Sequence, residues 1–227
     1  MRAAIIVIVM LAGSFAAGPG RAAPLGIYAG AGYAMVDKDA DRAVFVNEAV
    51  AIYNAFGFDP QNQTGRFDPK DSAYGFVVGW RLTEHLALEG GYIDLGDVTY
   101  RDTSTGLFAE TPPPETWQQN IDSGTSGVAL SALGILPLSY RWEVFGRGGL
   151  LLSNSTESVF ITDRVGSEKL RASKSGVDFL AGVGISMSLV EIYSVRLEYM
   201  RVFDAGEDDT LNPADVDVLS LNVTVSF

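Results

Sequence analysis

The feature that most constrains this chain is an alternation of apolar residues with small or polar ones, with a period of two, that recurs up to the last residue. In one segment Tyr74, Phe76, Val78, Trp80 and Leu82 alternate with Ala73, Gly75, Val77, Gly79 and Arg81. Similar alternation occupies eight segments: 25–36, 72–82, 86–98, 121–136, 140–153, 175–189, 194–203 and 215–227. This is the period of a β-strand. Most segments reach the roughly 9 to 11 residues that a tilted strand needs to cross a bilayer. The sequence therefore predicts an all-β fold.

The connections between the predicted strands alternate in length. Those near 83–85, 137–139 and 190–192 are tight turns, whereas the connections between them are long and rich in Asp, Asn, Ser, Thr and Pro. Bacterial outer-membrane barrels have short periplasmic turns and longer external loops. We therefore expect an eight-stranded antiparallel up-and-down transmembrane β-barrel, with long external loops that include 37–71 and 99–120 and with both chain ends on the short-turn side.

The first long connection has helical character. Within 41–56, the residues Phe45, Ala49, Ile52 and Phe56 have the spacing of one helix face. A loop of this length usually has its own structure or a function. Two interpretations remain open at this point: a short helix that packs on the barrel rim, and a lid or adhesive surface.

Composition and the first residues narrow the class of protein. The chain has no cysteine, which excludes disulfides, thiolate metal sites, lipid anchoring through cysteine and cysteine nucleophiles. Its formal net charge of -12 argues against a nucleic-acid partner. Arg2, an apolar run and small residues form a secretory signal pattern, with cleavage after Ala16, Ala22 or Ala23. We expect a signal peptide at 1–22 and an exported barrel at 23–227, without a transmembrane helix.

Alternation alone does not say which face lies inside, because a soluble barrel of the lipocalin type places its apolar face inward. Two features favour the opposite arrangement. The polar faces are rich in small residues, as a narrow lumen requires, and the final strand ends on the aromatic Phe227. The small residues are Gly75, Gly79, Gly127, Ser131, Gly149, Gly182, Gly184 and Ser186. We therefore expect the apolar face to contact lipid.

Four segments carry a family resemblance through their order and spacing. They are LTEHLALEGGYIDLGD at 82–97, WEVFGRGGLLLS at 142–153, SVRLEYMRVFDAGED at 194–208 and LNVTVSF at 221–227. Together they resemble the transmembrane domain of the OmpA-like outer-membrane proteins. The resemblance implies an eight-stranded barrel in the bacterial outer membrane, and an assembly signal at Val223, Val225 and Phe227 that the outer-membrane assembly machinery reads. No peptidoglycan-binding domain follows the barrel in this sequence, so cell-wall tethering is not expected.

Five charged residues interrupt the predicted strands on the polar face: Glu89, Glu143, Arg147, Arg196 and Glu198. An Arg that faced lipid at the bilayer midplane would cost roughly 2 to 4 kcal/mol. An unpaired charge inside the barrel would also be unfavourable. We therefore predict an ion-pair network in the lumen with Glu89 and Arg196 at its centre, and the family resemblance implies the same. Because side chains fill an eight-stranded barrel, a closed lumen is favoured over a narrow solute channel.

Candidate enzyme and metal sites are weak. His85, the single histidine, lies in a predicted periplasmic turn, where it is poorly placed to serve a lipid-modifying enzyme. The acidic run 204–209 does not have EF-hand spacing. The glycines of 29–33 and 146–149 lack the GxGxxG pattern that cradles phosphate. We expect no catalysis, cofactor or metal. The expected partners are outer-membrane lipid, the assembly machinery and an extracellular partner of the loops 37–71 and 99–120.

Overall fold

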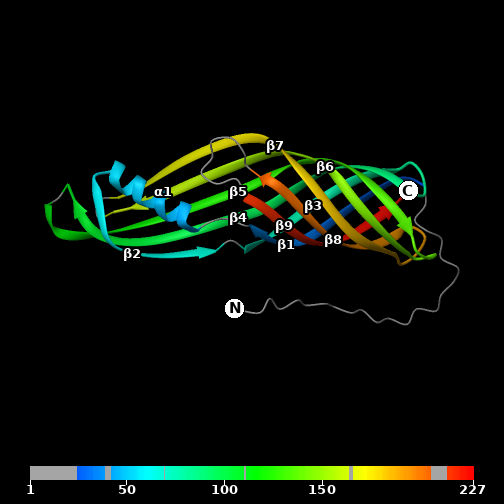
Figure 1. Ribbon diagram of the computed structural model, residues 1–227, viewed down its shortest axis with the longest axis horizontal. Helices are drawn as coiled ribbons and strands as arrows, with labels where there is room; N and C mark the ends of the chain where they lie inside the picture. Colours follow the sequence, from blue (N-terminus) through cyan, green and yellow to red (C-terminus); the bar gives the residue numbers. More distant parts are fainter. Residues whose placement is uncertain (1–24, 39–41, 69, 110, 164–165, 206–213) are drawn as a thin grey trace.

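The computed structural model describes residues 25–38, 42–68, 70–109, 111–163, 166–205 and 214–227 (Figure 1). The expected signal peptide at 1–22 lies outside these residues. The elements are β1 (Gly26–Lys38), α1 (Arg42–Ala55), β2 (Phe58–Asp68), β3 (Lys70–Arg81), β4 (Leu86–Phe108), β5 (Thr111–Pro137), β6 (Trp142–Thr162), β7 (Ser167–Ser188), β8 (Tyr193–Ala205) and β9 (Ala214–Ser226).

Eight of the strands close into a ring. Their order is β4-β3-β1-β9-β8-β7-β6-β5, and the β4–β5 pairing completes the circle. Every pairing is antiparallel. The ninth strand, β2, pairs with β4 beyond the point where β3 leaves it. The predicted eight-stranded antiparallel barrel is confirmed, with one additional strand in the first long connection.

The three short turns lie at one end of the ring. In each turn, a backbone N–H donates to the carbonyl of the first residue of the next strand, from Leu82, Leu138 and Leu189, at 2.9 to 3.0 Å. The same end holds the final residue, because the N–H of Phe227 donates to the carbonyl of Ile27 at 2.9 Å. The three predicted tight turns are therefore confirmed, and they lie together at one end of the ring.

The long connections differ from the expectation. Residues 99–120 are almost entirely strand, because β4 and β5 stay paired from Leu86 and Gly134 up to Phe108 and Thr111. Likewise β6 continues to Thr162 and β7 begins at Ser167. With β2, these parts form a five-stranded sheet beyond the ring, which we call the extension: 58–68, 97–108, 111–125, 154–162 and 167–176. The polarity of these segments is typical of loops, but their threonines favour strands and their backbones pair with neighbouring strands.

A β-bulge separates the ring part of β4 from its extension part. The pairing with β5 shifts between Asp94 and Asp97, and Gly96 between them has a positive φ of 65°. The inserted residue reverses the faces of β4, because side chains alternate with a period of two. Below the bulge Glu89 points inward, and above it the even-numbered Tyr100 does so, both being buried.

The predicted helix exists as α1, and it packs on the inward face of the extension. Its buried residues are Phe45, Ala49 and Tyr53, whereas the expected Ile52 and Phe56 are only partly buried. The sheet side of this cluster is Phe58, Val98, Tyr100, Trp117, Ile121, Val159 and Ile161. The helix therefore covers the inward face of the extension, beyond the end of the ring. Among the described residues, no helix has the length and apolarity needed to cross a membrane.

The outward face of the ring is apolar. Its aromatic side chains include Tyr33, Tyr74, Trp80 and Phe179, which are 57 to 69% exposed. The aliphatic ones include Val78, Val128, Leu130, Leu152, Val183, Leu197, Leu221 and Val223. Water would not stabilise such a surface, whereas the hydrocarbon of a bilayer does. The orientation with apolar residues outside is the one that the sequence favoured.

Candidate functional site

The inside of the ring holds a cluster of charged side chains around Glu89 on β4. Its Oε1 accepts from Arg196 Nη1 of β8 at 2.5 Å and from the hydroxyl of Tyr28 of β1 at 2.5 Å. Its Oε2 accepts from Arg147 Nη2 of β6 at 2.5 Å. Glu89 is 4% exposed. Four strands that are distant in the sequence therefore meet at one carboxylate.

Glu198 completes this cluster on the far side of Arg147. The Arg147 Nε lies 2.6 Å from Glu198 Oε1, and its Nη2 donates to Glu198 Oε2 at 3.2 Å. Two arginines and two glutamates make the cluster formally neutral. Mutual pairing offsets much of the cost of removing these four charges from water.

The guanidinium of Arg196 lies between two aromatic rings. It is 5.2 Å from the ring centroid of Tyr28 and 5.1 Å from that of Phe145. Both rings occupy space that opposite glycines leave open, because a Cβ on Gly79 would overlap the Tyr28 ring and one on Gly184 would overlap the Phe145 ring. Cation–π contacts of this kind contribute up to about 2 kcal/mol when desolvated. The two glycines thus make room for the aromatic rings that enclose Arg196.

Glu143 belongs to a separate pair nearer the short turns. It accepts from Arg81 Nη1 and Nη2 at 3.0 and 2.8 Å, a bidentate geometry. Arg81 Nη2 also donates to the carbonyl of Glu84 in the first short turn at 2.8 Å. The predicted network includes Glu143 with Glu89 and omits Arg81, whereas the structure pairs Glu143 with Arg81. The alternation offered the signal for Arg81, because it shares a face with the inward Gly79.

An apolar plug fills the ring between the charge cluster and the extension. It consists of Ala34, Val36, Ala73, Leu95, Ala129, Leu151, Leu180, Met200, Val202, Ala205, Val216 and Val218, all buried. On β8, Met200 is the next inward residue after Glu198, so the plug begins directly above the charges. Sequence reasoning missed the plug because runs such as 150–152 are apolar on both faces.

A buried lysine lies at the upper end of the plug. Lys38 is beyond Met35, the last outward apolar residue of β1, and its Nζ donates to the carbonyl of Gly96 at 2.8 Å. Burial lowers its pKa to about 8, against the opposing effect of the carboxylates of Asp97, Asp71 and Asp94. Lys38 therefore places a cation among the acidic residues at this level.

Polar contacts hold α1 inside the extension. The hydroxyl of Tyr53 donates to Asp102 Oδ2 at 3.0 Å, and Ser104 Oγ donates to the same oxygen at 2.8 Å. Burial, followed by the hydrogen bond to Glu157 and the charge of that residue, raises the pKa of Glu48 on α1 to about 8. Helix docking therefore depends on hydrogen bonds to two acidic groups of the sheet.

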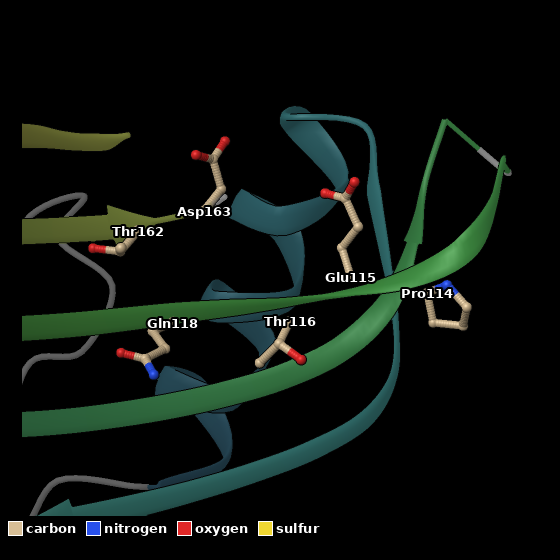
Figure 2. Close-up of a pocket in the computed structure, with 6 residues that line it drawn as sticks. All are labelled: Pro114, Glu115, Thr116, Gln118, Thr162 and Asp163. Atoms are coloured by element: carbon tan, nitrogen blue, oxygen red, sulfur yellow. The ribbon is translucent and has the colours of Figure 1, made fainter. Parts of the chain in front are cut away.

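A surface hollow of about 490 Å³ lies at the tip of the extension, near the ends of β5 and β6 (Figure 2). Its lining residues are Pro114, Glu115, Thr116, Gln118, Thr162 and Asp163. Across the described ranges, no three His, Cys, Asp or Glu side chains are arranged to hold a metal ion. The hollow lies far along the strands from the charge cluster, so it is a separate surface feature.

The remaining predicted positions are scattered. His85 is exposed in the first short turn, with Nδ1 3.1 Å from the carbonyl oxygen of Ile135. Val223 faces outward, and Phe227 is 80% exposed beside β1. The acidic run 204–209 falls largely outside the described residues. None of these positions meets the charge cluster.

A family model and several known proteins are similar to this chain. The family model described as the OmpA-like transmembrane domain matches residues 23–227. Outer membrane protein A of Serratia marcescens is 26% identical over 156 residues, which cover 67% of this chain and only 38% of that protein. Neisserial surface protein A superimposes with a TM-score of 0.52 at 12% identity, covering 89% of this chain and 97% of that one. Ail of Yersinia pestis superimposes with a TM-score of 0.48 at 12% identity, covering 90% of this chain and 100% of that one.

Proposed function

Because the chain belongs to the family of OmpA-like transmembrane domains, a β-barrel family of the bacterial outer membrane, we propose that it is a closed barrel with a structural and surface-interaction role. In this proposal the ring anchors the extension in the membrane and presents its outer surfaces. Lipid surrounds the apolar face of the ring, and a partner outside the cell contacts the extension.

The apolar plug carries the proposal of a closed lumen. A water-filled pore requires a polar lining along its whole length, and the twelve buried apolar residues of the plug interrupt any such lining. Below the plug, the cluster around Glu89 and the pair of Arg81 with Glu143 add two further layers of side chains. The interior of an eight-stranded ring is just wide enough for side chains to fill. In this proposal the three layers of side chains therefore leave no space for a water-filled channel.

Conductance in planar bilayers tests this proposal. The wild-type protein should give no stable channels. A variant that thins the plug, Leu151→Gly/Leu180→Gly/Met200→Gly, should leak measurably, whereas Val128→Gly/Leu130→Gly/Leu152→Gly on the lipid face should not. Large, stable, voltage-independent channels from the wild-type protein would overturn the closed-barrel proposal in favour of a narrow solute channel.

The proposed role does not include catalysis. His85 lies at the short-turn end and contacts a backbone carbonyl, so it is far from the external rim where lipid-modifying chemistry would occur. Lipid A incubated with the wild-type protein should release no more acyl chain than lipid A incubated with His85→Ala. Release that depends on His85, or on serines of the rim, would show an enzyme.

Membrane insertion is proposed to use the carboxyl-terminal strand. Val223 lies on the outward face of β9, and the exposed Phe227 directly follows this strand, so an assembly receptor can reach both side chains. Phe227→Ala should lower the amount of folded protein in the outer membrane several-fold, whereas Tyr140→Ala in a short turn should not. Heat-modifiability gels of membrane fractions distinguish folded from unfolded protein in this experiment.

A further inference from the structure

The outward face of the extension carries one row of side chains that crosses all five strands. The pairing register aligns Arg66 of β2 with Arg101 of β4, Asn120 of β5, Phe160 of β6 and Lys169 of β7. All but Asn120 are exposed. Neighbouring strands are about 4.8 Å apart, so the row is about 19 Å wide. We call these five residues the cationic row.

The cations of this row have no ion-pair partner among the described residues. Within the part of the chain that the structure describes, no ion pair involves Arg66, Arg101 or Lys169. Arg66 and Arg101 stand directly opposite each other, and like charges in that position destabilise a strand pair. An anion between the two guanidinium groups would convert this repulsion into attraction.

The neighbours of the row leave its charges available. Asp122, the nearest acid on β5, accepts from Thr99 Oγ1 at 3.0 Å and from Asn120 Nδ2 at 2.7 Å. Lys169 lies 4.4 Å from the ring centroid of Phe160. The face thus offers cations and an exposed aromatic ring, which are groups that recognise an anionic saccharide.

The next row away from the membrane adds hydroxyl and amide groups. It consists of Thr64, Thr103, Gln118 and Thr162, which the register aligns across β2, β4, β5 and β6. All four side chains are exposed. Hydroxyls and amides both donate and accept hydrogen bonds, as sugar hydroxyls require. Together the two rows place polar side chains on the outward face of the extension, whose strands continue beyond the ring (Figure 1).

The height of the row selects the kind of anion. On β6 the run of outward apolar residues that belongs to the ring ends at Leu152, and Phe160 lies eight residues further along the strand. Eight residues span about 26 Å along a strand, or about 20 Å along the membrane normal at the tilt of such barrels. A phospholipid head-group layer is only about 5 to 8 Å thick, so it does not reach the row. A lipid with a long saccharide head group does.

We infer that the cationic row binds the phosphorylated saccharide of the glycolipid that surrounds the barrel in the outer leaflet. The row faces sideways, along the wall that continues the lipid-facing surface, so this saccharide is the molecule beside it at that height. A partner in solution would meet the tips of the strands first. The inference rests on the proposed surface role and names one partner for it, and it is independent of whether the lumen conducts.

Binding of fluorescent lipopolysaccharide to the full-length protein in detergent tests the inference. Arg66→Gln/Arg101→Gln should weaken binding at least fivefold, and raising the salt concentration should weaken wild-type binding in the same direction. The matched control is Arg141→Gln/Lys174→Gln, which removes two cations from a short turn and from the other face of β7. The control should bind within twofold of wild type, and heat-modifiability gels establish that each variant folds.

Two further probes identify the source of the anion. Dephosphorylated lipopolysaccharide should bind as weakly to the wild-type protein as the phosphorylated form does to the Arg66→Gln/Arg101→Gln variant. Equal affinities of the two double variants would overturn the inference. A sulfated oligosaccharide without lipid that binds wild-type protein as tightly as lipopolysaccharide would also overturn it, in favour of a soluble glycan. Conductance measurements test the proposed function separately, so the two failures are distinguishable.

Discussion

The ring and the extension are built from the same strands, yet their faces carry opposite residues. On β5, the outward residue is Leu130 in the ring and Gln118 in the extension, whereas the inward residue is Ser131 in the ring and Trp117 in the extension. The backbone and its period of two are the same in both regions. What differs is the medium outside, which is lipid around the ring and, as we propose, water or saccharide around the extension. The apolar face therefore follows the environment rather than the strand.

The side chains that fill the interior also differ between the two regions. The ring cannot use its apolar residues for a large core because most of them face lipid, so its centre contains a compact plug and buried ion pairs. The extension has water outside, and it can collect its aromatic residues inside around α1, with Phe58 stacked on Trp117 at 4.7 Å between centroids. One region is specified by charge pairing, and the other by packing against a helix.

The largest effect should come from breaking the charge cluster of the ring. Glu89→Gln leaves Arg196 and Arg147 with one carboxylate between them, and loss of one partner of a buried pair costs about 3 to 5 kcal/mol. Unfolding by urea in detergent should show this loss. Glu84→Gln, the same change in an exposed turn, should alter the free energy of unfolding by less than about 0.5 kcal/mol. Equal stabilities would mean that the cluster does not stabilise the ring.

A charge placed on the outward face of β5 tests the comparison directly. Leu130→Arg puts a cation against lipid and should cost about 2 to 4 kcal/mol. Gln118→Arg, on the same face of the same strand but in the extension, should be nearly neutral. The free energies of unfolding in lipid bilayers measure the difference. If both variants lose the same stability, the two regions do not differ in their surroundings.

Removing one hydroxyl should loosen α1 without affecting the ring. Tyr53→Phe deletes the hydrogen bond to the buried carboxylate of Asp102, and such bonds to charged groups contribute about 1.5 to 3 kcal/mol. Hydrogen exchange of the α1 amides should accelerate, while exchange in β8 and β9 stays unchanged. Tyr140→Phe in a short turn serves as the control. Faster exchange throughout the ring would show that the two regions unfold together.

The smallest effect should be a pH dependence of helix docking. Because the pKa of Glu48 is about 8 when docked and about 4.5 ordinarily, the docked state holds its proton more tightly. Docking is then strongest at low pH and weakens as pH rises from about 4.5 through 8. Exchange of the α1 amides, corrected for intrinsic rates, should accelerate a few-fold over this range. Glu48→Gln should abolish the change, and persistence of the change in that variant would assign it elsewhere.

The ring was largely predictable from sequence because its strands combine strict alternation with tight turns. The helix was predictable from the spacing of Phe45 and Ala49. The hairpin at 99–120 was not, because its polar residues face outward and its sequence looks like a loop. Period-two reasoning depends on knowing which face is apolar, and that assignment reverses between the two regions.

The site was predictable only where parity, that is, the odd or even position of a residue along its strand, decides whether a side chain points into the lumen or outward. Parity placed Glu89, Arg147, Arg196 and Glu198 on one face, and the structure brings these four side chains together. Parity could not show which acid pairs with which base, so the pairing of Glu143 with Arg81 was missed. The cationic row could not be predicted from the sequence either. Its alignment depends on the register between five strands, and the sequence of a single strand does not specify that register.

The bulge at Gly96 limits how this molecule can change length. Since one inserted residue exchanges the two faces of a strand, a single insertion or deletion near Gly96 would turn Tyr100 into the water and Arg101 onto α1. Growth of the β4–β5 hairpin should therefore proceed by two residues on each strand at a time, which lengthens it by about 7 Å per step. Descendants of this sequence would differ in the reach of the extension by discrete increments, with the bulge itself kept in place.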